Sequence, residues 1–504
     1  MQTGFMAVCF CFSLLRNCMA RQDILVGTMV SEFFAGRLIS FPVLYFCMKL
    51  EFHGAAGGVT GSHTILEAND SRIGIDAGLY QGSEGVKNRS GFGYMPGSLK
   101  ALLLTHAHID HCGRIPLLVK EGFPGSVYST SATKDLCEIM LKDSAHLMAE
   151  ANDHENRHPD PKQNPPRPPL YTESDVLSAM KRFQPVDYEK KFDLAGITIN
   201  FRDSGHILGS AMIELSVGGK KIVFSGDLGR PGVPILKDPE KIDEADYLVL
   251  ESTYGNKDHE NMGSRGKKLL EIVQGTLERG GNVVIPAFAV GRTQEILYEL
   301  NPYAEKGALK GVKCYVDSPM AISAGEIYSR HPECFDSETL SLLKRGDSPF
   351  EFPGLSCTRS ATDSKAINDQ KEPHIIISAS GMCTGGRILH HLIQNLGRKD
   401  STILFVGYQA EGTLGQRLVS GSKSVQVLGR QMDVQAKIES LESFSAHAGR
   451  SENLQWLHAF KRFPETVFLN HGEPNAVEAL SQMIKQEFGA EVVAAKAGKS
   501  YMLG

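Results

Sequence analysis

The chain has 504 residues, of which 41% are hydrophobic and 22% charged, and its formal net charge is −5. This composition excludes wholesale disorder and a strongly basic protein that coats nucleic acid, and the length suffices for two or three folded domains. A local basic groove is compatible with a weakly acidic whole, so RNA is not excluded as a partner.

Residues 1–47 differ from the rest of the chain. They are rich in Cys, Phe and Met, show no clean periodicity and carry four of the ten cysteines. The apolar stretch at 7–15 has no basic residue before it and is too short to cross a bilayer, so we expect neither a secretory signal nor a membrane anchor. We regard this extension as uninformative, and a start-site artefact with Met48 as the real start would explain it. The other cysteines form no CxxC pair, which favours a reduced, cytoplasmic protein.

Alternating apolar patterns with Gly and Asp turns predict strands from Met48 onward. The predicted strands lie at 49–54, 62–68, 71–78, 101–105, 197–204, 211–217, 220–227 and 245–253. The strand at 101–105 is a continuous apolar run that leads into a helix at 114–122, which indicates α/β organisation. The Pro-rich segment at 144–172 is predicted to be a surface loop in which His154 and His158 are solvated.

After Tyr254 the pattern becomes a regular alternation of strand and helix. An amphipathic helix is predicted at 263–281, and strand-to-helix units follow at 282–300 and 374–393. This alternation predicts a separate parallel-sheet domain. Its expected bounds are 256–430, with the first domain at 48–255 and its continuation at 431–504, where isolated histidines return at loop positions.

The segment THAHIDH at 105–111 crowds three histidines and an aspartate directly behind a buried strand. Side chains two apart in an extended segment point the same way, so His106 and His108 can reach one metal ion. The turn into the next helix brings Asp110 and His111 to the same place. Imidazoles suit zinc and a carboxylate suits a second ion, so the pattern predicts a binuclear hydrolytic site with ions about 3.5–4 Å apart.

Four residues do not complete two metal sites, and the missing ligands are expected at later strand ends. His206 in DSGHILGS, Asp227 in FSGDLGR and His471 in FLNHGE each follow an apolar strand and lie beside a glycine. A capping or loop role is the alternative for each of these residues taken alone.

Together with Asp76 upstream, these residues resemble the metallo-β-lactamase fold, an α/β protein built as an αββα sandwich of two mixed sheets with metals at one sheet edge. That fold serves several hydrolytic chemistries. LESTYG with Glu251, FSAHAG with His447 and NHGE with His471 resemble motifs A, B and C of the β-CASP subfamily, a nucleic-acid-processing branch. PAFAVGRTQEIL, DSPMA and SASGMCTGGR resemble its inserted parallel-sheet domain, so the resemblance covers residues 48–504.

The resemblance implies a role for each candidate residue. His106, His108 and His206 would hold one metal ion, Asp110, His111 and His471 the other, and Asp227 would bridge them. Asp76 would orient the ligands without binding strongly. The implied catalytic residues are Asp110, Glu251 and His447, with His447 held by Glu251 as the general acid. The implied cofactors are two Zn²⁺ ions, or Mn²⁺ in their place.

The Gly-rich turn SASGMCTGGR follows a strand and precedes a helix, so its backbone N–H groups could hold an RNA phosphate. Ser380, Gly381 and Arg387 are the candidates there, and Arg292 occupies a comparable place after another strand. The alternatives are a tight turn for the glycines and an ion pair for Arg292.

The resulting hypothesis is a zinc-dependent ribonuclease that hydrolyses single-stranded RNA by a two-metal mechanism in RNA processing or decay, with endonucleolytic cleavage as the expected mode. With one tryptophan in the chain, reading of the RNA backbone is favoured over extensive base stacking. The alternatives are a small-molecule thioesterase or lactonase on the same metal core, and a catalytically silent RNA-binding scaffold. A homodimer and a monomer both remain open.

Overall fold

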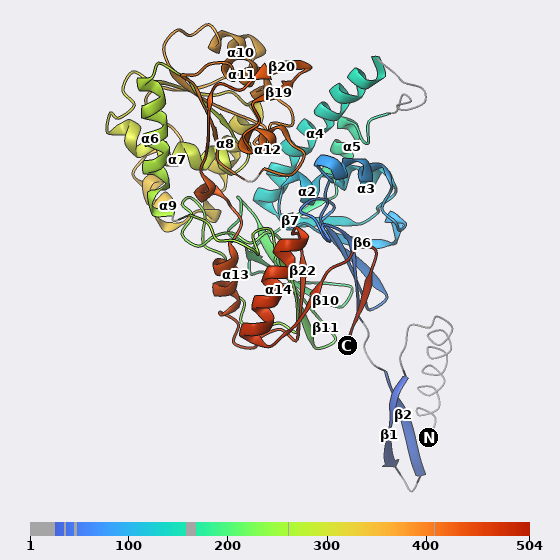
Figure 1. The fold of residues 1–504 in the computed structure, drawn as a ribbon. Helices are drawn as coiled ribbons and strands as arrows, with labels where there is room; N and C mark the ends of the chain where they lie inside the picture. The colour runs from blue at the N-terminus through green and yellow to red at the C-terminus, as the bar shows by residue number, and fades with distance from the viewer. Residues whose placement is uncertain (1–25, 35–36, 45–47, 158–167, 261, 408) are drawn as a thin grey trace.

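The computed structural model describes residues 26–34, 37–44, 48–157, 168–260, 262–407 and 409–504 (Figure 1). Within the 1–47 extension, β1 (Val26–Phe34) and β2 (Arg37–Leu44) pair with each other as an antiparallel hairpin. In the described part of the chain no helix is both long and apolar enough to span a bilayer.

Two mixed sheets of seven strands each form the larger domain. The first sheet has the order β24 (Ser500–Leu503), β3 (Met48–Gly54), β4 (His63–Ala68), β5 (Ser71–Ile75), β6 (Leu99–Leu103), β7 (Ser126–Thr130) and β8 (Phe183–Val186). The second sheet has the order β23 (Glu491–Ala494), β22 (Thr466–Asn470), β13 (Tyr247–Glu251), β12 (Lys220–Phe224), β11 (Ala211–Val217), β10 (Ile197–Asp203) and β9 (Phe192–Leu194). Because β24 pairs with β3 and β22 with β13, the end of the chain returns to the first domain, as its loop histidines indicated.

The two sheets pack face to face through the apolar residues on one face of their strands. Along β3, for example, every second residue is buried, and Leu50 and Phe52 join a core with Phe201 and Ile213 of the opposite sheet. Helices cover the outer faces (Figure 1). They are α2 (Ile109–Cys112), α3 (Ile115–Lys120), α4 (Ser131–Arg157) and α5 (Glu173–Met180) on the first sheet, and α13 (Arg450–Leu457) and α14 (Pro474–Phe488) on the second. This is the predicted αββα sandwich.

The inserted domain has a six-stranded sheet in which all neighbouring strands are parallel. Its order is β16 (Leu355–Cys357), β15 (Lys313–Val316), β17 (His374–Ser378), β14 (Val283–Pro286), β18 (Thr402–Phe405) and β21 (Lys437–Ser440). Its helices are α6 (Arg265–Glu278), α7 (Arg292–Glu305), α8 (Pro319–Arg330), α9 (Ser337–Lys344), α10 (Ala361–Ile367), α11 (Ile388–Asn395) and α12 (Leu414–Val419). A small hairpin of β19 (Ser424–Val427) and β20 (Arg430–Asp433) follows them.

Two sequence-based expectations differ from the structure. Residues 144–157 belong to α4 and not to a surface loop, because helix-forming residues continue until the prolines after residue 158 disfavour a helix. His158 and the Pro-rich run lie outside the described residues, and the side chain of His154 is not described. The sheet of the inserted domain also extends past residue 430 to β21, a short edge strand of mixed polarity that gives a weak signal.

The stability of the protein is expected to depend on pH because of Asp203, at the end of β10. Burial raises the pKa of its carboxyl group to about 7, although the backbone N–H of Gly205 donates to it. The pKa of Asp203 in the folded protein lies above the ordinary value of 3.8, so protonation of this group favours folding. This contribution to stability is complete below pH 3.8 and is lost as the pH rises through about 7.

Asp203→Asn is therefore expected to be more stable than the parent at pH 8, by up to about 4 kcal/mol, and to show much less of a difference at pH 4. Denaturant unfolding of both proteins at the two pH values measures this. An equal difference at both pH values would show that Asp203 is not protonated in the folded protein near neutral pH.

Candidate metal centre and active site

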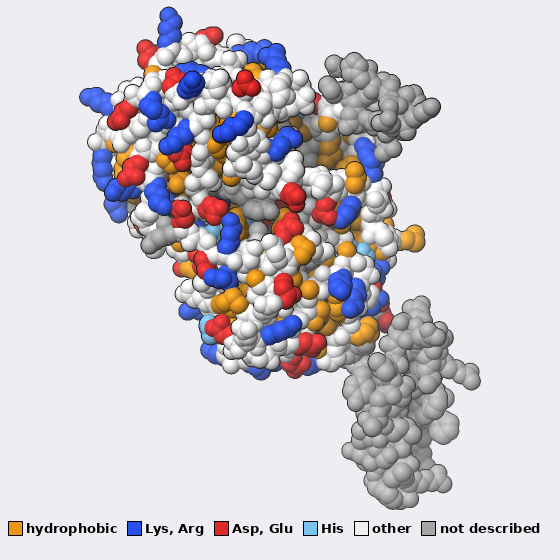
Figure 2. Space-filling view, viewed as in Figure 1, with side chains coloured by type: hydrophobic (Ala, Val, Ile, Leu, Met, Phe, Trp, Pro, Cys, Tyr) orange, Lys and Arg blue, Asp and Glu red, His pale blue; other side chains and the backbone are white. Residues whose placement is uncertain are grey.

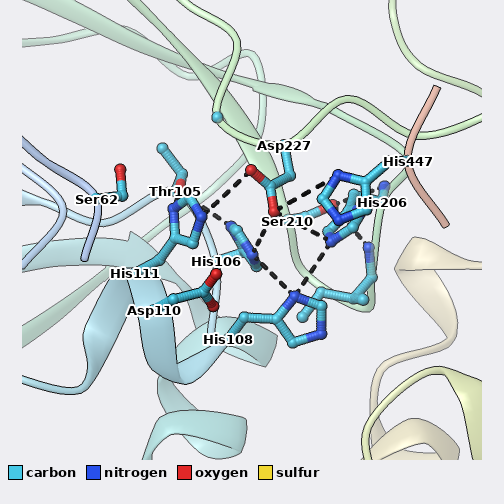
Figure 3. Close-up of polar contacts among 12 residues, drawn as sticks. Ser62, Thr105, His106, His108, Asp110, His111, His206, Ser210, Asp227 and His447 are labelled. Carbon is cyan, nitrogen blue, oxygen red and sulfur yellow. Dashed lines mark hydrogen bonds and ion pairs between the residues drawn. The ribbon is translucent and has the colours of Figure 1, made fainter. Parts of the chain in front are cut away.

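The predicted ligands meet at one edge of the sandwich because each follows the end of a strand. The HxHxDH segment follows β6, the loop with His206 joins β10 to β11, and Asp227 follows β12. His471 follows β22 directly. In Figure 3 the side chains of His106, His108 and His206 point toward Asp227, which lies between His111 on one side and His206 on the other.

His106, His108, His206 and Asp227 form a first cluster that could hold a metal ion. Nδ1 of His108 lies 3.1 Å from Nε2 of His106 and 3.1 Å from Nε2 of His206. Oδ2 of Asp227 lies 3.4 Å from His106 Nε2 and 3.5 Å from His206 Nε2. Two ligands of a tetrahedral zinc ion are about 3.3 Å apart, so these separations fit one ion.

Asp110, His111 and His471 form a second cluster beside the first. Nε2 of His111 lies 3.1 Å from Nε2 of His471, and Nε2 of His471 lies 3.6 Å from Oδ2 of Asp110. The other oxygen of Asp227, Oδ1, lies 3.2 Å from Nε2 of His111. One carboxylate therefore faces both clusters, one oxygen toward each, which is the arrangement of a bridging ligand.

The hydrogen-bonding of the ligand atoms gives a second reason to expect a cation. Asp227 Oδ1, which faces the second cluster, is a buried polar atom without a hydrogen-bond partner, and several imidazole nitrogens face each other rather than a donor group. Buried polar atoms are normally paired, so such a convergence of lone pairs points to a missing positive centre. The residues present thus suit a pair of metal ions.

The charges of the first cluster suit metal binding. Burial lowers the pKa of His206 well below its ordinary value and that of His108 to about 3, so both imidazoles are neutral, which is the ligand form. Burial alone would raise the pKa of Asp227, but His111 and His471 outweigh it and hold that pKa well below the ordinary value. The Asp227 carboxylate is therefore ionised. In the second cluster burial lowers the pKa of His111, but the carboxylates of Asp227 and Asp76 outweigh it and raise that pKa well above its ordinary value.

Asp76 orients the second cluster and does not face the first. Its Oδ2 lies 2.7 Å from Nδ1 of His111, which directs Nε2 of that ring toward the cluster. Its Oδ1 accepts hydrogen bonds from the backbone N–H and the hydroxyl of Thr105. Asp76 is 2% exposed and has a φ of 57°, so the turn after β5 is strained to aim this carboxylate.

Glu251 and His447 form a pair at the rim of the clusters. Nδ1 of His447 lies 3.0 Å from Oε1 of Glu251, and the backbone N–H groups of Leu228 and Thr253 donate to the two oxygens of Glu251. Burial lowers the pKa of His447, but the charges of Glu251 and Asp227 outweigh it and raise the pKa to about 9. The imidazole is 19% exposed, so it is held in its donor form where a substrate can reach it.

The two arginines predicted to contact RNA are engaged within the inserted domain. Arg292 is 6% exposed and its Nη1 donates to Glu295, which is the ion pair that the sequence left open. Arg387 donates from Nη1 to Asp317 and from Nη2 to the carbonyl of Arg359. Both guanidinium groups therefore have carboxylate partners already.

The Gly-rich turn with Ser380 and Gly381 lies between β17 and α11. The hydroxyl of Ser380 accepts from the backbone N–H of Thr384 within the turn. A Cβ built on Gly381 would lie 2.9 Å from the ring of Phe288, so this glycine permits a close approach. The Phe288 ring is half-buried and lies 6.4 Å from that of His108, so the turn borders the metal clusters through Phe288.

Sequence reasoning did not single out Phe288, Arg230 or His259, although each contacts the site or its supports. Phe288 lies in the PAFAVGR segment directly after a strand, and this position at a strand end could have identified it as a candidate. On the face drawn in Figure 2, Lys and Arg side chains are interspersed with Asp and Glu and form no single stripe. No broad basic field is therefore visible on that face of the molecule.

Comparison with known proteins agrees with this geometry. Residues 57–272 match the Metallo-beta-lactamase superfamily, 293–418 match the Beta-Casp domain, and 431–495 match the Zn-dependent metallo-hydrolase RNA specificity domain. The first and third of these families are defined by metal binding, in agreement with the His and Asp clusters.

Three relatives illustrate the similarity. The chain is 37% identical to Ribonuclease TTHA0252 of Thermus thermophilus, covering 90% of this chain and 99% of that protein. It is 31% identical to the transcription termination factor FttA of Methanosarcina mazei, covering 87% and 69% of the two chains. It is 32% identical to an RNase J-like protein of Methanocaldococcus jannaschii, covering 84% and 92%. This chain is therefore a hydrolase of the β-CASP branch of the metallo-β-lactamase superfamily.

Proposed function

We propose that the protein is a zinc-dependent ribonuclease that hydrolyses phosphodiester bonds of single-stranded RNA in RNA processing or decay, with two metal ions. The observation that carries the proposal is the position of Asp227, whose two oxygens face two separate groups of converging ligand atoms, 3.4 Å from His106 Nε2 and 3.2 Å from His111 Nε2. The names of the similar ribonucleases support RNA as the substrate.

Each candidate residue of this chain has a separate proposed role. His106, His108 and His206 would hold one ion, Asp110, His111 and His471 the other, and Asp227 would bridge them. When bound, the ions supply an activated water molecule and neutralise charge on the phosphate. Asp110 is 19% exposed, as is His447, so the phosphate is expected to approach from the side where these two side chains lie.

His447 is proposed to protonate the leaving oxygen. Its Nδ1 faces the Glu251 carboxylate, which leaves Nε2 as the ring atom that can donate to a substrate. Glu251 is held in place because two backbone N–H groups also donate to its carboxylate oxygens. A histidine held in this way provides the acid that an alkoxide leaving group needs.

Contacts with RNA outside the reacting phosphate are proposed for the inserted domain. The backbone at Ser380 and Gly381 could accept a phosphate, and Arg292 and Arg387 would contribute only where RNA replaces part of their ion pairs. Because Phe288 brings the inserted domain next to His108, an RNA strand at the clusters would touch both domains, which favours an unpaired strand. The cytoplasm is the proposed location, and a homodimer is compatible with the proposal.

Cleavage of RNA labelled at either end tests this function. The zinc-loaded protein is expected to yield internal fragments from single-stranded RNA and few from the matching duplex, with activity lost on chelation and restored by Zn²⁺ or Mn²⁺. Metal content is measured on the same sample. A ladder of products from one end of the RNA would show that the protein is an exonuclease and not an endonuclease. Hydrolysis of a thioester or lactone without RNA cleavage would favour the small-molecule hydrolase, and a protein that binds no metal would favour the RNA-binding scaffold.

A further inference from the structure

The two segments that connect the domains lie side by side next to the metal centre. Tyr254, in the outgoing segment, forms a parallel bridge with Gly449 in the returning segment. The backbone N–H of Arg450 donates to the carbonyl of Lys257, and that of Ser451 donates to Oδ1 of Asp258 at 2.7 Å. The outgoing segment thus holds the start of α13 and the loop before it, which carries His447.

His259 makes the contact closest to the proposed proton donor. Its Nε2 lies 3.0 Å from the backbone carbonyl oxygen of His447, and its ring packs at 4.4 Å against the ring of Tyr254. A carbonyl only accepts, so Nε2 carries the proton. The opposite nitrogen, Nδ1, is buried without a hydrogen-bond partner, as expected of a neutral ring that serves only as a donor.

Gly449 allows this close packing. A Cβ built on it would lie 3.0 Å from Cδ2 of His259 and 3.5 Å from Cα of Asp258. Any side chain there would require His259 or the returning segment to shift by a few tenths of an ångström. The final glycine of the motif FSAHAG therefore suits the close contact with the outgoing segment.

Arg230 connects the returning segment and α13 to the loop that carries Asp227. It is 3% exposed, and its Nε donates to both oxygens of Glu452 in α13, at 3.0 and 3.1 Å. Its Nη1 donates to the carbonyl of Ser443 in the returning segment. The metal-bearing loop, the returning segment and α13 are therefore fixed to one another, and His259 adds the contact that reaches the backbone of His447 itself.

We propose that His259 is a positioning residue for His447. The proposal rests on the proposed function, in which His447 protonates the leaving oxygen. The Nε2 hydrogen bond fixes the carbonyl of His447, while Glu251 fixes its ring, so backbone and side chain are held by separate partners. Small displacements of a catalytic group have large effects, on the order of a hundredfold for about 1 Å.

A comparison of two substrates tests the role of His259. Single-stranded RNA has a poor alkoxide leaving group and needs an acid, whereas bis(p-nitrophenyl) phosphate has a leaving group that departs without one. His259→Ala is expected to lower kcat on RNA by about tenfold to a hundredfold and to leave kcat on the nitrophenyl ester within about twofold. His259→Gln, which retains an N–H donor at similar reach, is expected to recover most of the RNA activity.

His374→Ala is the matched control. His374 is buried, whereas His259 is half-buried, and Nδ1 of His374 likewise lies 2.9 Å from a backbone carbonyl, that of Glu372. It lies on β17 in the inserted domain, away from His447. Metal content and Tm are measured for all variants. The control is expected to retain both activities.

The outcomes separate the two proposals. If His259→Ala cleaves RNA at the parent rate while His447→Ala does not, His259 has no positioning role and the proposed function stands. If His447→Ala also cleaves RNA at the parent rate, the acid role in the proposed function fails. Equal losses on both substrates, or a Gln variant no better than Ala, would mean that His259 supports the site as a whole and would overturn the proposal.

Discussion

Replacement of Asp227 with asparagine is expected to lower kcat/KM for RNA by about a thousandfold or more. Oδ2 of Asp227 lies 3.4 Å from Nε2 of His106 and Oδ1 lies 3.2 Å from Nε2 of His111, so this one carboxylate faces both clusters. An amide keeps the shape but loses the charge that faces two cations. Metal ions stabilise the transition state by several kcal/mol, and each 1.36 kcal/mol corresponds to a factor of ten.

Metal analysis shows whether the loss has the expected cause. The variant is expected to retain fewer than two ions per chain after dialysis, while its circular dichroism matches that of the parent. Asp246→Asn is the control, because Asp246 is also largely buried but accepts from Lys221 and Arg462 at the opposite ends of the strands. An Asp227→Asn protein with two bound ions and parental activity would contradict the bridging role.

Much of the metal centre could be predicted because strand ends leave a clear pattern. His106, His108, Asp110 and His111 stand in one short segment, and an extended chain followed by a helical turn places them together without knowledge of the fold. His206, Asp227 and His471 are far apart in sequence, but each follows an apolar strand. Parallel neighbours such as β12, β13 and β22 end at one edge, so the structure brings these residues together.

The partners of polar groups were harder to predict. Arg387 was expected to be available to RNA, but it meets Asp317, which also accepts from Thr358, Ser364 and His391. Ser364 lies in α10 and His391 in α11, whereas Thr358 follows β16 and Arg387 precedes α11. Nothing local in the sequence indicates that these donors converge. Such pairing depends on the packing of the inserted sheet, whereas the order of its strands and helices follows from local periodicity.

The supports of His447 illustrate the same limit. The pairing of Glu251 and His447 was available only through resemblance to motifs A and B, since the two residues are separated by the whole inserted domain. The contact with His259 was not available at all. It depends on the outgoing and returning segments lying side by side, which is a property of the domain insertion.

Substitution of His447 by alanine is expected to lower kcat for RNA by about a hundredfold to ten-thousandfold, the range typical of lost acid catalysis. His447 faces Glu251 at 3.0 Å and lies 3.9 Å from Oδ2 of Asp227, so it is close to both clusters but is predicted not to be required as a ligand. Metal content is therefore expected to stay at two ions, and hydrolysis of bis(p-nitrophenyl) phosphate is expected to change little.

Glu251→Gln refines this test of the acid. The amide removes the negative charge that favours the protonated imidazole but can still accept from Nδ1. We expect a smaller loss on RNA than for His447→Ala and a lower pH for the falling limb of the rate profile, because the pKa of His447 falls when the charge of Glu251 is removed. If His447→Ala instead loses metal and both activities together, His447 acts as a ligand and the leaving oxygen must be protonated by another group.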